Sequence, residues 1–210
     1  MRGIFLAAQC AAISLIAFPA AATIAIYTSP GAVQPAENVL FSGPDPIGNT
    51  VIGFTNQTQT RVTFNGIEPL VSPPAGQARI EATDGGLTEL SFGLDPGLGF
   101  KEVEFDLFGT HAEATQVVLN FTDQFSTIFA GTYAIHQGGN FFSARAFDNQ
   151  LITNVRFMLD GPIIDAGQFR IGGVGEAGAV PEPAMWAMMM AGMGLVGVAM
   201  RRRKAALAAA

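Results

Sequence analysis

Three acidic residues at alternate positions, Glu102, Glu104 and Asp106, are the side chains that could do chemistry in the middle of the sequence. In a strand, alternate residues share one face and lie roughly 6–7 Å apart. Glycosidases place two carboxylates at about this separation. An alternating acidic row is also what the solvated face of a half-buried strand contains. We expect such a solvated face and no catalysis; an extracellular glycan hydrolase that uses Glu104 or Asp106 is the alternative.

The sequence contains no other familiar catalytic pattern. His111 and His136 stand 25 residues apart, outside any H-E-x-x-H spacing, and there is no G-x-S-x-G. We therefore predict no catalytic residue and a protein that is not an enzyme. Calcium stays an open alternative with unknown ligands, since acidic turns occur at 84–86 and 160–162 but no EF-hand loop is present.

The N-terminus has the three parts of a secretory signal peptide. Arg2 supplies a positive charge, residues 4–18 are apolar and small residues follow, so we predict cleavage after Ala22, with Ala25 as second choice. A membrane anchor is the alternative, but fifteen apolar residues are short of the roughly 20 that a span needs. We expect export through the Sec machinery. Removal of residues 1–22 takes away the only cysteine, so the exported part has no disulfide.

The middle of the chain is acidic once its two ends are set aside. Between residues 23 and 180 there are 6 basic and 16 acidic residues, and 6 minus 16 is about −10. Nucleic-acid binding needs basic patches that contact phosphates. We therefore exclude nucleic acid as a partner.

Apolar residues between about 36 and 173 recur with a period of two, which indicates strands. Clusters of Gly, Pro and Asp separate the runs and supply turns. The pattern predicts an all-β fold, an antiparallel β-sandwich or jelly roll of about 8–10 strands. We assign it to residues 37–173, between an extended N-terminal segment at 23–36 and a Gly-rich linker at 174–180. The runs are 38–42, 50–54, 60–66, 78–83, 87–94, 100–108, 115–123, 127–136, 140–147, 152–160 and 166–173.

The chain ends with an uncharged apolar segment and four positive charges. Residues 184–200, as a helix rising about 1.5 Å per residue, would cover roughly 25 Å of a bilayer core about 30 Å thick. We predict one transmembrane helix there. Basic residues stay on the cytoplasmic side and stop transfer, which places the β-sandwich outside. The basic cluster consists of Arg201, Arg202, Arg203 and Lys204.

This tail closely resembles the PEP-CTERM sorting signal in its PEPxxWA variant; the resemblance spans residues 180–204, and the signal itself is assigned to 181–204. The family's signal is recognised by an exosortase, a membrane protease-transpeptidase of Gram-negative bacteria that also make exopolysaccharide. The resemblance implies a protein anchored transiently in the inner membrane by its C-terminal helix. Processing would then deliver it to the cell surface, the outer membrane or the extracellular space. The motif at 181–187 contains Pro181, Glu182, Pro183, Trp186 and Ala187, and residues 205–210 extend beyond the basic cluster.

The sequence therefore predicts an exported cell-surface or extracellular-matrix protein that an exosortase processes and that is associated with exopolysaccharide or biofilm. The alternative is a carbohydrate-binding module with structural calcium. Sugar-binding platforms favour exposed Trp or Tyr, but the only Trp belongs to the tail and the mature domain has just Tyr27 and Tyr133. We expect the 17 phenylalanines to serve mainly as core.

Overall fold

The computed structural model describes residues 23–41, 48–73, 79–109, 113–178 and 188–197. The chain divides into two compact units. The unit Ala22–Ala179 contains every described strand, and we call it the β domain. The other unit combines Met1–Ala21 with Val180–Ala210.

The all-β prediction is confirmed, because each of the eleven predicted runs overlaps a strand. Alternating burial along these strands shows why they form: one face packs into the core while the other faces outward. The strands are β1 (Ile24–Tyr27), β2 (Glu37–Leu40), β3 (Gly48–Thr55), β4 (Arg61–Val71), β5 (Arg79–Ala82), β6 (Leu87–Leu94), β7 (Leu98–Gly99), β8 (Glu102–Gly109), β9 (Gln116–Asp123), β10 (Ile128–Ala134), β11 (Gly138–Ala146), β12 (Ile152–Ile163), β13 (Asp165–Gly172) and β14 (Gly175–Glu176).

Two short strands lie outside the predicted limits of the sandwich. β1 lies within 23–36 and pairs with β11, while β14 lies within 174–180 and pairs with β7. The Ala177 amide also donates to the Gly97 carbonyl at 2.8 Å. Such short segments become strands through their partners and carry little alternation of their own. The β domain therefore starts before residue 37 and continues beyond residue 173.

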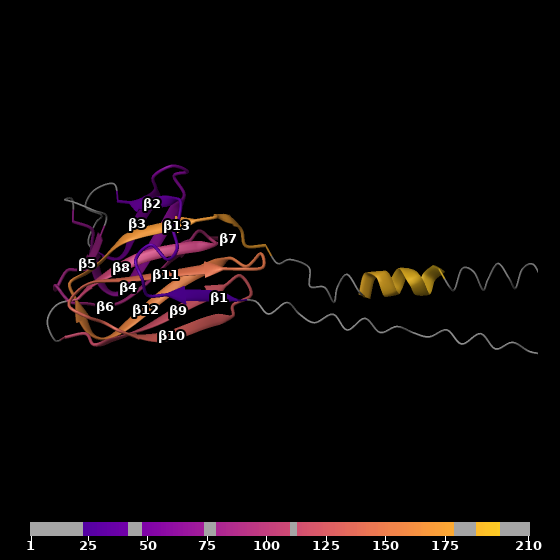
Figure 1. The fold of residues 1–210 in the computed structure, drawn as a ribbon. Coiled ribbons are helices and arrows are strands. Elements are labelled where there is room, and N and C mark those ends of the chain that lie inside the picture. The colour runs from indigo at the N-terminus through magenta and orange to yellow at the C-terminus, as the bar shows by residue number, and fades with distance from the viewer. Residues whose placement is uncertain (1–22, 42–47, 74–78, 110–112, 179–187, 198–210) are drawn as a thin grey trace, which may run out of the picture. The chain divides into compact units, whose positions relative to one another are not determined.

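Twelve strands form one antiparallel sheet in the order β1-β11-β8-β13-β2-β3-β4-β6-β12-β9-β10, with β5 pairing to both β13 and β4 (Figure 1). The sheet turns at β13, whose register shifts between Gly167 and Arg170. Before this bulge β13 pairs with β5, and after it with β2. Because bulges bend a strand and increase its twist, the sheet folds over into two facing layers. The first layer contains β1, β11, β8 and β13, and the second contains β4, β6, β12 and β9.

Phenylalanine rings fill the space between the layers. Phe105 of β8 contacts Phe92 of β6 and Phe157 of β12, with centroids 5.6 and 6.1 Å apart. These contacts cross the sandwich, and each such aromatic pair adds about 0.5–1.5 kcal/mol beyond the burial of its area. The expectation of a phenylalanine core is confirmed for Phe64, Phe92, Phe100, Phe105, Phe121, Phe142, Phe157 and Phe169, which are all buried.

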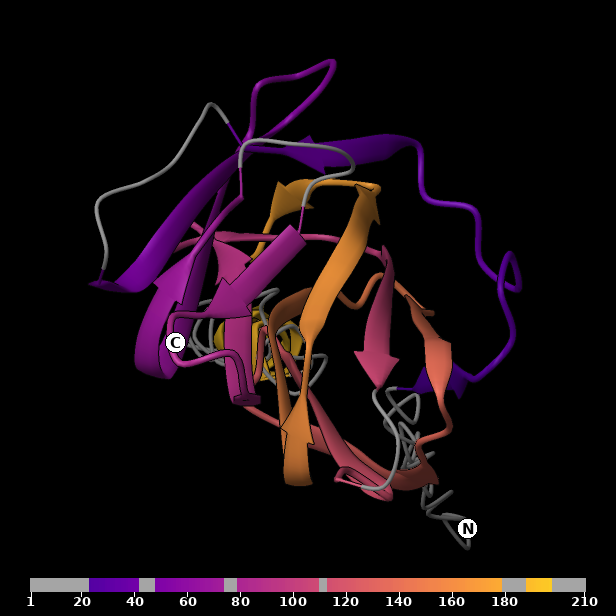
Figure 2. The ribbon, with the colours of Figure 1, turned by 90° about the vertical axis from the view of Figure 1, so that its left-hand side faces the viewer.

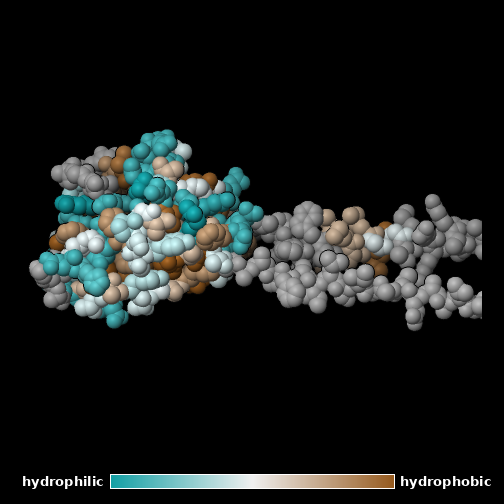
Figure 3. All heavy atoms as spheres, in the orientation of Figure 1, coloured by the Kyte–Doolittle hydropathy of each residue, from teal (hydrophilic) through white to brown (hydrophobic). Residues whose placement is uncertain are grey.

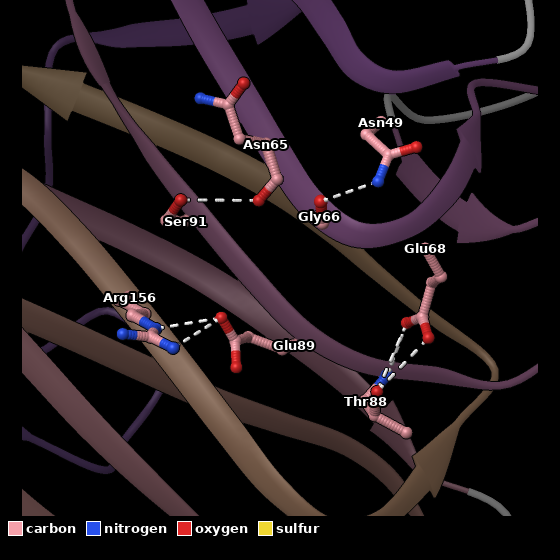
Figure 4. A network of polar contacts seen from close by, with 8 residues as sticks. All are labelled: Asn49, Asn65, Gly66, Glu68, Thr88, Glu89, Ser91 and Arg156. Carbon is pink, nitrogen blue, oxygen red and sulfur yellow. Dashed lines mark hydrogen bonds and ion pairs between the residues drawn. The ribbon is translucent and has the colours of Figure 1, made fainter.

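The outer face of the second layer is polar, and its side chains bridge neighbouring strands (Figure 4). Arg156 of β12 donates to Glu89 Oε1 of β6 through Nε at 2.9 Å and Nη2 at 2.7 Å. Ser91 Oγ donates to the Asn65 carbonyl of β4 at 3.3 Å. Partly exposed contacts of this kind contribute little individually. We interpret this face as the ordinary solvated side of the sandwich.

The second unit is described over residues 188–197, which form a helix with exposed side chains. Within the described parts of the chain, no helix has the length and apolar character needed to cross a membrane. The predicted span 184–200 extends past this helix at both ends. Several predicted segments lie outside the described residues: the signal peptide 1–22 with its cleavage at Ala22, the motif 181–187, the basic cluster 201–204 and the tail 205–210.

Candidate functional site

The acidic row of β8 lies on the outer face of the first layer, but two of its three acids, Glu104 and Asp106, are buried. Val103, Phe105 and Leu107 point into the core, as the alternation predicted. The expectation of a solvated acidic face is wrong, because Glu104 is 5% exposed and Asp106 is 7% exposed. We call the outer side of β8, together with that of β11, β13 and β5, the β8 face. It is the candidate functional site because it gathers buried polar groups.

The connection between β1 and β2 covers one end of the β8 face. Figure 2 shows this connection, in indigo and violet, running around one side of the domain. Gly31 N–H donates to Glu104 Oε2 at 2.9 Å, and Arg170 Nη1 lies 3.4 Å from Glu104 Oε1. Arg170 Nη2 also donates to the Pro35 carbonyl at 3.1 Å. Both oxygens of Glu104 therefore help to hold the connection between β1 and β2, which we call the crossing segment, against the sheet.

Asp106 lies further along β8, beside Gly139 of β11. A Cβ at Gly139 would come within 2.9 Å of Asp106 Oδ2, so the glycine leaves the space that the carboxylate fills. Asp106 Oδ1 is buried and has no hydrogen-bond partner among the described residues. Burial raises the pKa of the Asp106 carboxyl, against the opposing effect of the Asn140 and Leu107 backbone amides. A buried acceptor without a donor disfavours the charged carboxylate, which agrees with the raised pKa.

Asp165 of β13 is a second acid in this part of the face. It pairs with Phe108 of β8 on one side and with Glu81 of β5 on the other. Burial raises the pKa of Asp165; the Arg79 cation lowers it, and the negative charges of Glu81 and Asp106 raise it further. Arg79 Nε lies 2.9 Å from Glu81 Oε1, so Arg79 is the counter-ion of Glu81. Asp106 and Asp165 are therefore two neighbouring carboxyls with raised pKa values.

Two aromatic rings flank these acids. Phe108 is 42% exposed, and Phe141 of β11 is half-buried and pairs with Asp106. An exposed ring offers an apolar surface, and carboxylates beside it can accept hydrogen bonds from hydroxyls. We call Asp106, Phe108, Phe141 and Asp165 the open end of the β8 face. Such a combination can bind a polyhydroxylated ligand.

Sequence reasoning found Asp106 but missed Phe108 and Asp165 as candidates for the site. Phe108 was overlooked because phenylalanines were assigned mainly to the core. Its position in the sequence could have identified it, because Phe108 continues the alternation of Glu102, Glu104 and Asp106 on the outward-facing side of β8. Asp165 carried no signal, because only the pairing of β13 with β8 brings it near Asp106.

In the turns at 84–86 and 160–162, which were candidates for calcium binding, the carboxylates accept hydrogen bonds from backbone amides of the domain itself. Asp84 Oδ1 accepts from the Gly86 amide at 3.1 Å, and Asp160 Oδ1 accepts from the Thr115 amide at 2.8 Å. The described residues contain no group of three or more His, Cys, Asp or Glu side chains that could hold a metal ion. His136 is exposed at the end of β10, and His111 lies outside the described residues.

Comparison with protein families identifies the C-terminal segment. Residues 179–204 match the model of the PEP-CTERM protein-sorting motif, so the chain carries this sorting motif. The predicted resemblance is confirmed. The motif implies an exported protein that transits the membrane and is processed by an exosortase.

No curated protein matches the sequence. Among solved structures, the chain is similar to an exo-beta-agarase, with 12% identity, a TM-score of 0.34, and coverage of 65% of this chain and 25% of that one. It is similar to CBM29_1, a family 29 carbohydrate binding module from Piromyces equi, with 14% identity, a TM-score of 0.28, and coverage of 75% and 92%. It is also similar to the enzymatically active domain of tailspike protein 4 of bacteriophage CBA120, with 12% identity, a TM-score of 0.28, and coverage of 72% and 19%. The chain thus spans a quarter of the length of the agarase chain.

Proposed function

We propose that this chain is an exported cargo protein whose C-terminal tail is removed by an exosortase and whose β domain acts without catalysis at the cell surface or in the extracellular polysaccharide. The observation that carries the proposal is the position of the sorting motif. The family match begins at residue 179, and the last strand, β14, ends at Glu176. The motif therefore follows the domain directly, where a tail can be removed.

Removal of the tail would leave the β domain complete. Its strands lie between Ile24 and Glu176, and its buried apolar core lies between Ile24 and Ile171. Cleavage at or after the start of the motif would therefore remove no strand and no core side chain. This supports a tail that serves sorting and a domain that functions after delivery.

A non-catalytic role fits the environment of the acids on β8. Glycoside hydrolysis requires one acid and one base or nucleophile that both face the substrate. Glu104 instead faces the crossing segment, with its oxygens engaged by Gly31 and Arg170. Glu104 is therefore not free to face a substrate, which weakens the Glu104–Asp106 pair that the sequence suggested for the hydrolase alternative.

We propose that the ligand is a sugar chain of the exopolysaccharide, bound at the open end of the β8 face. Two observations favour this site: the Phe108 ring is 42% exposed, and the carboxyl-bearing Asp165, paired with Phe108 across the strands, is partly exposed. A sugar hydroxyl would donate to the carboxylate while the apolar side of the sugar packs on the ring. A neutral or basic polymer suits the site better than an acidic one, because the domain carries about −10.

Mass spectrometry of the protein from cells with and without active exosortase tests the processing. In active cells the C-terminal peptide should end within or near the motif, while cells without exosortase should retain Trp186 and the basic cluster. Glu182→Ala, inside the motif, should leave the tail attached. The control Glu176→Ala changes an exposed acid on β14 and should be processed normally. An intact tail in active cells would refute this part of the proposal.

Affinity electrophoresis in the producing strain's own exopolysaccharide tests the ligand. Phe108→Ala and Asp165→Asn should each weaken retention about tenfold, the effect of losing roughly 1.4 kcal/mol. Phe147→Ala is the matched control, since Phe147 is 40% exposed but lies beyond the end of β11. If the wild-type protein is not retained, the proposed ligand is wrong, while the proposal on processing is unaffected. Release of new reducing ends would overturn the non-catalytic role.

A further inference from the structure

β10 forms one edge of the twelve-stranded sheet, and no other described strand pairs with its outer side. It pairs with β9 along its full length of 7 residues, without a register shift. The strand at the other edge, β1, has 4 residues. Because short strands make poor templates for pairing, β10 is the more accessible of the two edges.

The hydrogen bonds at both ends of β10 show which of its backbone groups are free. The Asp123 amide donates to the Thr127 carbonyl at 3.0 Å, and the Ile135 amide donates to the Thr115 carbonyl at 2.9 Å. Odd-numbered residues of this segment therefore bond to β9. Since bonded and non-bonded positions alternate in an antiparallel ladder, the even-numbered residues direct N–H and C=O toward the open edge. They are Ile128, Ala130, Thr132 and Ala134.

β10 has none of the features that usually protect an edge strand. Proteins block edges with lysine, proline, bulges or very short strands. The sequence of β10, IFAGTYA, has no charge and no proline, and Ile128 is 61% exposed. Uncharged, proline-free segments of about this length with β-forming residues pair readily with other chains.

The distribution of charge makes a second copy of the chain a suitable partner for this edge. Two domains of about −10 repel each other over most of their surface. β10 has no charge, and the acid of β9, Asp123, is 1% exposed and accepts from Gln150 Nε2 at 2.8 Å. In Figure 3 the region that Figure 1 labels β1 and β10 is coloured mostly white to brown. Two acidic domains can therefore meet along β10 with little repulsion.

The sequence of β10 is also complementary to itself. About a two-fold axis at Gly131, antiparallel pairing places Ile128 opposite Ala134 and Ala130 opposite Thr132 of the second copy. This register uses all four free residues, for roughly eight backbone hydrogen bonds. Phe129 then lies opposite Tyr133 of the second copy at a non-bonded position, where side chains approach most closely. Both rings are only partly buried against their own core, so the pairing would cover them further.

We propose that the protein forms a symmetric dimer by antiparallel pairing of β10 with β10 of a second copy, which continues the sheet from one sandwich into the other. This dimer depends neither on the sorting motif nor on a polysaccharide ligand.

Multi-angle light scattering of the full 210-residue chain in detergent, with the bound detergent subtracted, measures the oligomeric state over a dilution series. Two chains per particle are expected. Thr132→Pro removes an N–H at the open edge and no hydrogen bond to β9, so it should weaken association at least about tenfold. Thr132→Val keeps the N–H and should remain dimeric.

A second pair of variants keeps the test independent of proline. Thr132→Glu adds two like charges near the axis and should dissociate the dimer, while Thr83→Glu adds the same charge in the exposed turn after β5 and should not. Circular dichroism confirms that each variant keeps its strands. A wild-type chain that is monomeric throughout the series overturns the proposal. Thr132→Pro and Thr132→Glu variants that are folded and still dimeric also overturn the proposal. That result would mean that residues outside the β domain associate.

Discussion

The guanidinium of Arg170 lies 3.4 Å from Glu104 Oε1, and it also donates to the Pro35 carbonyl at 3.1 Å. Arg170 is on β13, directly opposite Glu104 of β8, while Pro35 belongs to the segment that crosses both strands. A buried carboxylate is tolerated when it is paired and hydrogen-bonded. This contact therefore explains how an acidic residue in the row on β8 can be buried, and it gives Glu104 a structural role.

Replacement of Glu104 by Ala should lower the free energy of unfolding by about 1–3 kcal/mol, because the Gly31 amide loses its acceptor and Arg170 its counter-ion. Glu102 makes a more exposed ion pair, with Arg145 at 2.8 Å. Glu102→Ala should therefore change the free energy by less than about 1 kcal/mol. Urea denaturation of the processed protein measures both variants. Equal losses would contradict the anchoring role of Glu104.

Asp106→Asn should make the protein more stable at neutral pH and leave it unchanged in acid. Burial raises the pKa of Asp106 above its ordinary value of 3.8. The folded state therefore binds this proton more tightly than the unfolded state, and the stability it contributes is lost as pH rises through the raised pKa. The asparagine variant avoids that loss because it has no proton to release.

Thermal unfolding of wild type and Asp106→Asn between acidic and neutral pH measures this difference. The two melting temperatures should coincide below the ordinary pKa of 3.8 and diverge as the pH rises. An NMR titration gives an independent readout, since removal of the Asp106 charge should lower the pKa of Asp165. A constant difference in melting temperature at all pH values would argue against a titrating Asp106.

The sequence predicts the strands best where one face is buried in the core. β6 begins and ends where the alternation does, at Leu87 and Leu94. The sequence does not reveal β1, β7 and β14, because β1 (IAIY) has no polar residue to alternate with, β7 and β14 have two residues each, and all three depend on their pairing partners. Register and layer order depend on the bulge in β13, where Gln168 has a φ of 52°. No residue type in that stretch signals this conformation.

The candidate site was predicted less well than the fold. Period-two alternation places Glu104 and Asp106 on one face, and that part is confirmed. It cannot show that the segment between β1 and β2 folds over that face, because the contact joins residues 73 positions apart. Burial of Glu104 and the proximity of Asp165 to Asp106 both follow from tertiary pairing. The chemistry of the β8 face therefore becomes visible only in the folded domain.

Asp160→Asn should show the opposite pH dependence from Asp106→Asn. Hydrogen bonds from the Thr115 hydroxyl and from the Gln116 and Thr115 amides lower the pKa of Asp160 below 3.8. The stability contributed by this carboxylate is present above its unfolded pKa and is lost as pH falls through the lowered folded pKa. The variant should therefore be less stable than wild type at neutral pH, with the difference shrinking in strong acid. Thermal unfolding at both pH values measures it, and a difference that grows in acid would contradict the prediction.

Gly161→Ala should destabilise the β domain by about 1–3 kcal/mol, the usual effect of forcing an extra methyl group into a packed site. A Cβ at Gly161 would overlap the carbonyl oxygen of Glu113, which is backbone and can yield only if the chain shifts. The shift would also disturb the bond from the Thr115 amide to Asp160, so the loss should exceed that of a surface change. Gly178→Ala is the control, because a Cβ there meets nothing within 4 Å. Urea denaturation should show a lower midpoint for Gly161→Ala alone; equal midpoints for the two variants would mean that the segment at Glu113 moves without cost.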